Sequence, residues 1–171
     1  VADTGPGATI QDLGRPGWFS SGVGVAGAAD PVSYRLANRL LGNDENAAAI
    51  ECVLGGLHLV ALAPVVVAVT GAPAPVSVDG APAEHSCALQ LDAGQRLRLG
   101  IAGAGLRVYL GVRGGLAVEP VLGSRSRDTM AGIGPEPLQP GDELAIGREP
   151  VRPVPARAAA GRPITTDPIR V

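Results

Sequence analysis

The sequence predicts a mainly β protein, a sandwich or barrel of short strands, with one short helix near its amino terminus. Short β-branched or alternating runs recur at a spacing of roughly 8–12 residues, which is typical of such folds. Turns separate these runs, and the chain holds 25 glycines and 16 prolines without a collagen period. Because 46% of the residues are hydrophobic but only 2% are aromatic, we expect a core of Val, Leu, Ile and Ala. A length of 171 residues suits one domain, or one domain and a fragment of another.

The helix is predicted by the stretch DPVSYRLANRLLGN, residues 30–43. Asp30 is a good N-cap, Pro31 suits the first helical position, and Gly42 suits the left-handed residue after the end. We therefore expect a helix over about residues 31–41. The face expected to pack inward carries apolar residues at every fourth position, namely Val32, Leu36 and Leu40.

The strands follow the helix, where the period of the pattern changes to two. The clearest runs are VVVAVTG, VSVDG, QRLRLG and LRVYLGV. In QRLRLG the leucines are expected to point to one face and the arginines to the other, as in a sheet with one solvated face. The strand pattern stops near residue 148. We interpret residues 1–148 as one β domain, 149–163 as a linker, and 164–171 as the start of a second β unit.

Charge and composition argue against several classes of partner. The formal net charge is −2, all 14 basic residues are arginines, and they are scattered, so no nucleic-acid footprint is predicted. No apolar run reaches the 18 residues that a membrane helix needs, and the first residues lack the pattern of a signal peptide. Cys52 and Cys87 fit free thiols in a reducing cytoplasm. The two histidines and two cysteines are too widely spaced to predict a metal site.

Two glycine-rich motifs resemble catalytic signatures but lack their context. GVGVAG, residues 22–27, has the spacing of a dinucleotide-binding loop, but GRPGWFSS precedes it instead of a buried strand. GSRSRD, residues 123–128, contains Ser124, but neither His58 nor His85 completes a recognisable triad with it. The arginines of this second motif better suit an anion-binding or inter-subunit loop, because guanidinium groups pair well with carboxylates.

The stretch TIQDLGRPG, residues 9–17, gathers Gln11, Asp12 and Arg15 among glycines and a proline. One interpretation is a ligand-facing loop, with the arginine binding a carboxylate and the other two side chains binding N–H and C=O groups. The other is a structural pair of Asp12 and Arg15 that fixes the loop. Asp12 and Asp30 flank the glycine-rich loop and are the candidates for acid–base chemistry, although each also suits a cap or turn.

An ordered series of motifs resembles the family called allophanate hydrolase subunit 2, also known as KipA, biotin-dependent carboxyltransferase-like protein or the C subunit of 5-oxoprolinase. The series covers nearly the whole chain, and the first forty residues are the most specific part. Its members are TIQDLGRPG, GAAD (27–30), ANRLLGN (37–43), AAIECVLGG (48–56), TGA (70–72), GLRVYLGVRGG (105–115), LGSRSRD (122–128) and LQPGDEL (138–144).

The resemblance implies a cyclophilin-like β-barrel over residues 1–148, followed by a second, related half. It implies a KipI-like partner (allophanate hydrolase subunit 1) and, with a LamB/YcsF-like protein, the ATP-dependent opening of 5-oxoproline to glutamate. Two alternatives stay open: the carboxyltransferase component of a urea or amide carboxylase, and a KipA-like regulatory binding protein. No P-loop is present, so ATP is expected to be used by a partner. The chain has no lysine, so any biotin is carried by another protein.

The matching motifs also hold the residues that we expect at a site for a small amide substrate. The expected catalytic residues are Asp12 and Asp30. The expected substrate-binding residues are Gln11, Arg15, Asn38, Ser124 and Arg125. The sequence departs from the family pattern SGAMD, because it has alanine at positions 26 and 29, and it has GPEPL where the family tends to have GRPL.

Overall fold

The computed structural model describes residues 1–150 and 152–155, and it shows a mainly β fold. Ten strands, one α-helix and one turn of 3-10 helix are present in this part of the chain. In chain order they are β1 (Asp3–Thr4), β2 (Ala8–Gln11), the 3-10 helix η1 (Phe19–Ser21), α1 (Pro31–Leu40), β3 (Ala49–Val53), β4 (Leu57–Val60), β5 (Val65–Gly71), β6 (Val76–Val78), β7 (Ala81–Ala83), β8 (Ala88–Leu91), β9 (Arg96–Leu99) and β10 (Arg107–Val112).

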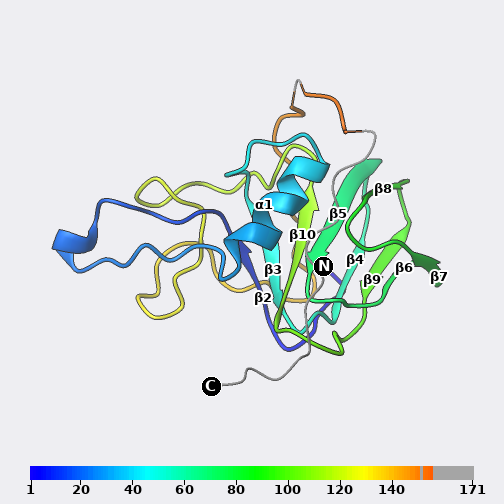
Figure 1. Cartoon of the computed structure of the whole chain (residues 1–171), viewed down its shortest axis with the longest axis horizontal. Helices are drawn as coiled ribbons and strands as arrows, with labels where there is room; N and C mark the ends of the chain where they lie inside the picture. The colour runs from blue at the N-terminus through cyan, green and yellow to red at the C-terminus, as the bar shows by residue number, and fades with distance from the viewer. Residues whose placement is uncertain (151, 156–171) are drawn as a thin grey trace, which may run out of the picture.

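The strands form two antiparallel sheets of five strands each (Figure 1). The first sheet has the order β1-β4-β9-β6-β7, and the second has the order β2-β3-β10-β5-β8. In the second sheet Tyr109 of β10 lies opposite Glu51 of β3 on one side and Thr70 of β5 on the other. The mainly β class is therefore confirmed, while the finer expectation of a cyclophilin-like barrel stays a prediction.

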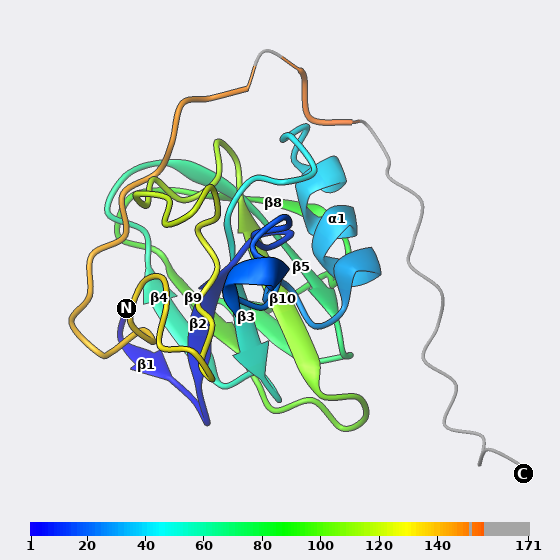
Figure 2. The ribbon, with the colours of Figure 1, turned by 90° about the vertical axis from the view of Figure 1, so that its left-hand side faces the viewer.

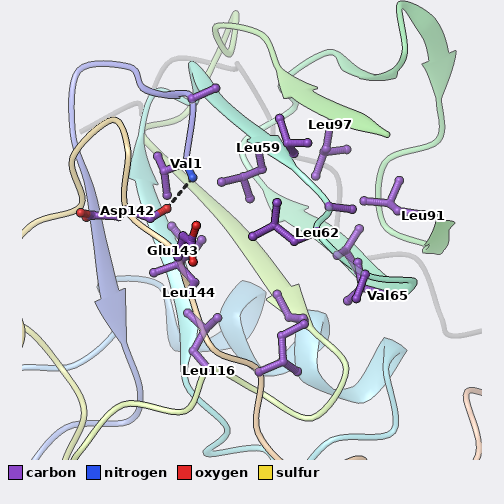
Figure 3. A pocket seen from close by; sticks show the side chains of 18 of the residues that line it. Val1, Leu59, Leu62, Val65, Leu91, Leu97, Leu116, Asp142, Glu143 and Leu144 are labelled. Atoms are coloured by element: carbon purple, nitrogen blue, oxygen red, sulfur yellow. Dashed lines mark hydrogen bonds between the residues drawn. The ribbon is translucent and has the colours of Figure 1, made fainter. Parts of the chain in front are cut away.

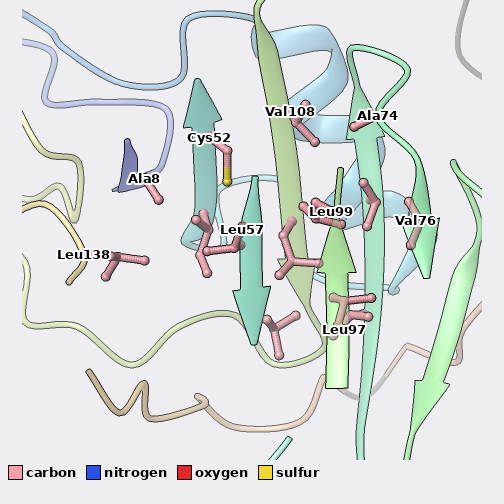
Figure 4. Close-up of a cluster of buried hydrophobic side chains, with 14 of the residues drawn as sticks. Ala8, Cys52, Leu57, Ala74, Val76, Leu97, Leu99, Val108 and Leu138 are labelled. Carbon is pink, nitrogen blue, oxygen red and sulfur yellow. The ribbon is translucent and has the colours of Figure 1, made fainter. Parts of the chain in front are cut away.

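The main core lies between the two sheets (Figure 4). It consists mostly of aliphatic side chains, as the composition predicts. In β9 the predicted alternation is confirmed, because Leu97 and Leu99 are buried while Arg96 and Arg98 are exposed. The other large core members include Ile10, Ile50, Leu57, Val67, Val69, Val108 and Leu110.

The helix α1 covers the outer face of the second sheet (Figure 2). Gly111 of β10 allows this close packing, since a Cβ there would lie 3.0 Å from Leu41 Cδ1 and 3.2 Å from Ala37 Cβ. The predicted limits of the helix are confirmed to within a residue, and the Asp30 carboxylate caps it by accepting the N–H groups of Val32 and Ser33.

The predicted inward face of the helix is partly wrong. Leu40 is buried, but Val32 is 76% exposed. The face that meets the sheet is formed instead by Tyr34, Ala37, Asn38 and Leu40. Tyr34 packs edge-on against Tyr109, with ring centroids 6.1 Å apart, so the aromatic contact sets how the helix is rotated.

The chain beyond the last strand runs back along the fold. Arg113 holds its final described part beside the end of α1. The guanidinium donates to the carbonyls of Leu41, Pro150 and Arg152 and pairs with Glu149. These contacts involve the first residues of the predicted linker 149–163; the predicted second unit, 164–171, lies outside the described residues.

Candidate functional site

The carboxylate of Asp12 is the centre of a buried polar cluster at the end of β2. Its Oδ1 accepts the hydroxyls of Ser124 and Ser126, each at 2.6 Å, and the N–H of Gly14 at 2.7 Å. Its Oδ2 accepts the N–H of Arg125 at 2.6 Å. Asp12 and both serines are fully buried. These bonds fix the loop after β2 to a loop more than a hundred residues later in the chain.

Arg15 completes the link between the same two loops. Its guanidinium donates to the carbonyl oxygens of Ser126 and Val121, the second at 3.5 Å, and the residue is only 1% exposed. Its Nη1 lies 4.0 Å from Asp128 Oδ2 and has no hydrogen-bond partner within the described residues. The predicted pairing of Asp12 with Arg15 is therefore replaced by a network in which each binds the 119–135 loop.

Gln11 extends the cluster along β2. Its Nε2 donates to Thr9 Oγ1 at 3.1 Å and to the carbonyl of Arg127 at 3.0 Å. Its Oε1 is buried and, in the part of the chain that the structure describes, accepts no hydrogen bond. The cluster thus contains two buried polar atoms with unused capacity, Gln11 Oε1 and Arg15 Nη1.

Asp30 and Asn38 lie at the start of α1 and within it, apart from the centre of the cluster. The Asp30 carboxylate caps the helix and also accepts the Ser33 hydroxyl. Asn38 is buried, donates to the carbonyl of Ala47 at 2.8 Å, and accepts from Asn43. The catalytic and substrate-binding roles stay predictions, and each Asp has a structural function that needs no ligand. Of the seven predicted residues, the structure brings together Gln11, Asp12, Arg15, Ser124 and Arg125.

Sequence reasoning missed a second buried network, centred on Glu51. Its Oε2 accepts the Tyr109 hydroxyl at 2.7 Å and the Ala29 N–H at 2.8 Å, and Arg107 lies 3.3 Å from its Oε1. The Tyr109 hydroxyl also accepts the N–H of Asp30. Burial, and then the bond to Glu51, raise the pKa of Tyr109 well above its ordinary value. The network connects the GAAD turn to the second sheet. The sequence signal that could have revealed it is Glu51, a charged residue in the middle of an apolar strand.

The structure also contains an apolar cavity of about 550 Å³ between the two sheets (Figure 3). Leucine and valine side chains line most of it, and its charged lining residues among those described are the acidic Asp142 and Glu143. None of the predicted site residues lines it. The lining residues come from scattered strands and loops, so no local motif predicted it.

Three further findings concern the described residues alone. No group of three or more His, Cys, Asp or Glu side chains there is placed to hold a metal ion. The helices in the same residues are all too short or too polar to span a bilayer. Cys52 and Cys87 are both free thiols, and burial raises the pKa of Cys52 to about 12.

The comparisons with known proteins place this two-sheet fold among carboxyltransferase domains. The chain belongs to the family described as carboxyltransferase domain, subdomain A and B, whose model matches residues 21–171. It is 42% identical over 143 residues to the C subunit of 5-oxoprolinase from Escherichia coli; the match covers 82% of this chain and 46% of that protein. It is 38% identical over 151 residues to urea amidolyase of Lachancea kluyveri, covering 85% of this chain and 8% of that protein.

The solved structures agree with the sequence relatives. The crystal structure of the K. lactis urea amidolyase matches 94% of this chain and 10% of its own, at 32% identity and a TM-score of 0.84. The chain spans about half the length of the 5-oxoprolinase relative and a small part of the urea amidolyases. The family predicted from the motifs is therefore confirmed.

Proposed function

We propose that this chain is part of a subunit of an ATP-dependent 5-oxoprolinase, a hydrolase that opens the cyclic amide 5-oxoproline to glutamate. The observation that supports this proposal most is the 42% identity to the C subunit of 5-oxoprolinase, of which the match covers 46%, whereas the match covers only 8% of the urea amidolyase relative. In this scheme the chain acts with a KipI-like subunit and a LamB/YcsF-like protein in the cytoplasm. The ATP is used by a partner, and the chain alone has no activity.

A second candidate function is the carboxyltransferase component of a urea or amide carboxylase. The family description and the likeness to urea amidolyase favour it. Carboxyl transfer would need a biotinyl group, and this chain has no lysine to carry one, so the group would reside on a partner. A KipA-like regulatory role, in which the protein sequesters its KipI-like partner, would use the same contact between the two proteins but would involve no catalysis.

Within the first proposal, the polar cluster is the place for substrate contact. Gln11 Oε1 and Arg15 Nη1 are buried and make no hydrogen bond within the described residues, and the nearest carboxylate to Nη1 is that of Asp128 at 4.0 Å. The two atoms therefore have the capacity to bind an amide N–H and a carboxylate. Asp12 would hold the two loops, and Asp30, Asn38, Ser124 and Arg125 would complete the surroundings. Both atoms are buried, so substrate contact requires a local opening of the cluster.

The test uses the full-length protein and its partners. Glutamate release from 5-oxoproline should require this protein, the KipI-like subunit, the LamB/YcsF-like protein and ATP together. Release by the isolated protein would contradict the assignment of ATP use to a partner. Failure of the complete mixture, combined with bicarbonate-dependent consumption of urea when a biotin carboxylase and biotinylated carrier are supplied, would favour the second candidate.

A further inference from the structure

Two loops, residues 13–29 and 119–135, project together from one side of the sheets, and we call them the arm (Figure 1). The chain has a single tryptophan, a single phenylalanine and a single methionine. All three lie on the arm and face solvent: Trp18 is 41% exposed, Phe19 is 84% exposed and Met130 is 98% exposed. Exposed side chains of this size on one projecting element indicate an interaction surface, since aliphatic side chains fill the main core.

The base of the arm is built to keep its shape. The backbone N–H of Arg15 donates to the carbonyl of Val25 at 2.7 Å, and that of Ala28 donates to the carbonyl of Asp12 at 2.9 Å, which closes the first loop. Gly27 is required in this closure, because its φ is +93° and a Cβ would lie 2.8 Å from the backbone of Leu13. The buried Asp12 cluster joins the second loop to the first. A surface that is ordered before binding loses little conformational entropy when a partner docks.

The chemistry of the arm indicates a protein partner. Residues 16–29 contain no charged side chain. In the second loop, Arg127 pairs with Glu136, and the Arg125 Nε donates to the carbonyl of Val118, so both guanidinium groups are held against the protein. Nucleic acids and anionic membranes are bound through free basic side chains, which the described arm does not offer. Exposed tryptophan, phenylalanine and methionine are instead the residues enriched at protein interfaces.

We infer that the arm is a docking element that inserts Phe19, Trp18 and Met130 into an uncharged apolar depression on the KipI-like subunit. This inference rests on the proposed function, in which that subunit is the partner. The chain's own residues 152–155 are a less suitable occupant, because Arg113 holds Arg152 beside the end of α1. In Figure 1 residues 152–155 lie above that helix, whereas the arm points away from the body of the molecule.

The experiment measures the affinity of the full-length protein for the purified KipI-like subunit by isothermal titration calorimetry. Phe19→Ser and Met130→Ser should each weaken binding at least about tenfold, because such anchors contribute much of the energy of an interface. Leu106→Ser is the matched control, since Leu106 is 52% exposed on the connection between β9 and β10; its affinity should stay within about twofold of the wild type. All three variants should keep the wild-type melting temperature.

The outcomes separate this inference from the proposed function. Unchanged affinity of both arm variants, or no binding of the wild type, would overturn the inference. It would equally be overturned if the arm variants lost self-association, or binding to vesicles of phosphatidylcholine and phosphatidylserine, while still binding the KipI-like subunit. If the arm variants lose binding but the assembled wild-type complex releases no glutamate, the proposed function fails and the docking role stands.

Discussion

Replacement of Asp12 by alanine should destabilise the protein strongly, because it removes the acceptor on which four donors converge. These donors are the hydroxyls of Ser124 and Ser126 and the N–H groups of Gly14 and Arg125. All lie where water has little access, so each donor left without a partner costs about 1–3 kcal/mol.

The net loss is smaller than the sum of four such costs. The two hydroxyls can rotate toward other acceptors, and water can enter the space that the carboxylate leaves. A hydrogen bond to a charged group contributes about 1.5–3 kcal/mol, so with this partial compensation we expect a net loss of about 3–5 kcal/mol. About 1 kcal/mol corresponds to roughly 2–4 °C in a chain of this size and to less in a longer protein, so the melting temperature of the full-length protein should fall by several degrees.

The assay is thermal unfolding of the full-length protein, followed by circular dichroism, beside glutamate release per folded molecule of the complex. Asp3→Ala is the matched control, since its exposed carboxylate accepts one N–H, that of Gly5; it should cost less than about 1 kcal/mol. Equal melting temperatures for Asp12→Ala and Asp3→Ala would refute the structural reasoning. If the activity of Asp12→Ala were lost at the same time, a catalytic role would be favoured.

Three further predictions concern other parts of the fold. Arg15→Lys keeps the charge but loses the planar fork, so a clear drop in melting temperature is expected, and an unchanged melt with weaker substrate use would instead indicate a ligand contact. Gly111→Ala should cost about 1–3 kcal/mol in urea unfolding, because the new methyl meets Leu41 at 3.0 Å; a neutral result would mean that the helix shifts freely. Burial raises the pKa of both tyrosines, Tyr34 and Tyr109, in the folded state. The stability that the two protonated tyrosines contribute is therefore fully present below pH ~10 and should be lost as the pH rises further. Tyrosinate absorbance should therefore appear together with alkaline unfolding and not before it.

Local signals explain which parts of the fold the sequence predicts well. The helix limits follow from Asp30, Pro31 and Gly42, and the strand β9 follows from strict alternation of leucine and arginine. Each of these signals acts within a few residues of the chain. The error at Val32 has a tertiary cause, because the packing of Tyr34 against Tyr109 decides which face of the helix meets the sheet.

The sequence identifies most residues of the polar cluster but not how they are arranged in space. Gln11, Asp12 and Arg15 stand out in the sequence because they are polar residues among glycines. Asp12 and Arg15 contact Ser126, which lies more than a hundred residues later in the sequence, and no local sequence pattern predicts such contacts. Ser126 itself was noticed only as part of a motif, and its burial against Asp12 depends on how the 119–135 loop folds back.

The placement of the aromatic residues divides the chain into two optically separate parts. The single tryptophan, Trp18, lies on the arm, and both tyrosines are buried between α1 and the second sheet. Selectively excited tryptophan emission therefore comes from the arm alone, without any label or mutation. A shift of that emission when a partner is added would follow docking directly, while near-ultraviolet tyrosine signals would show whether the body of the fold had changed.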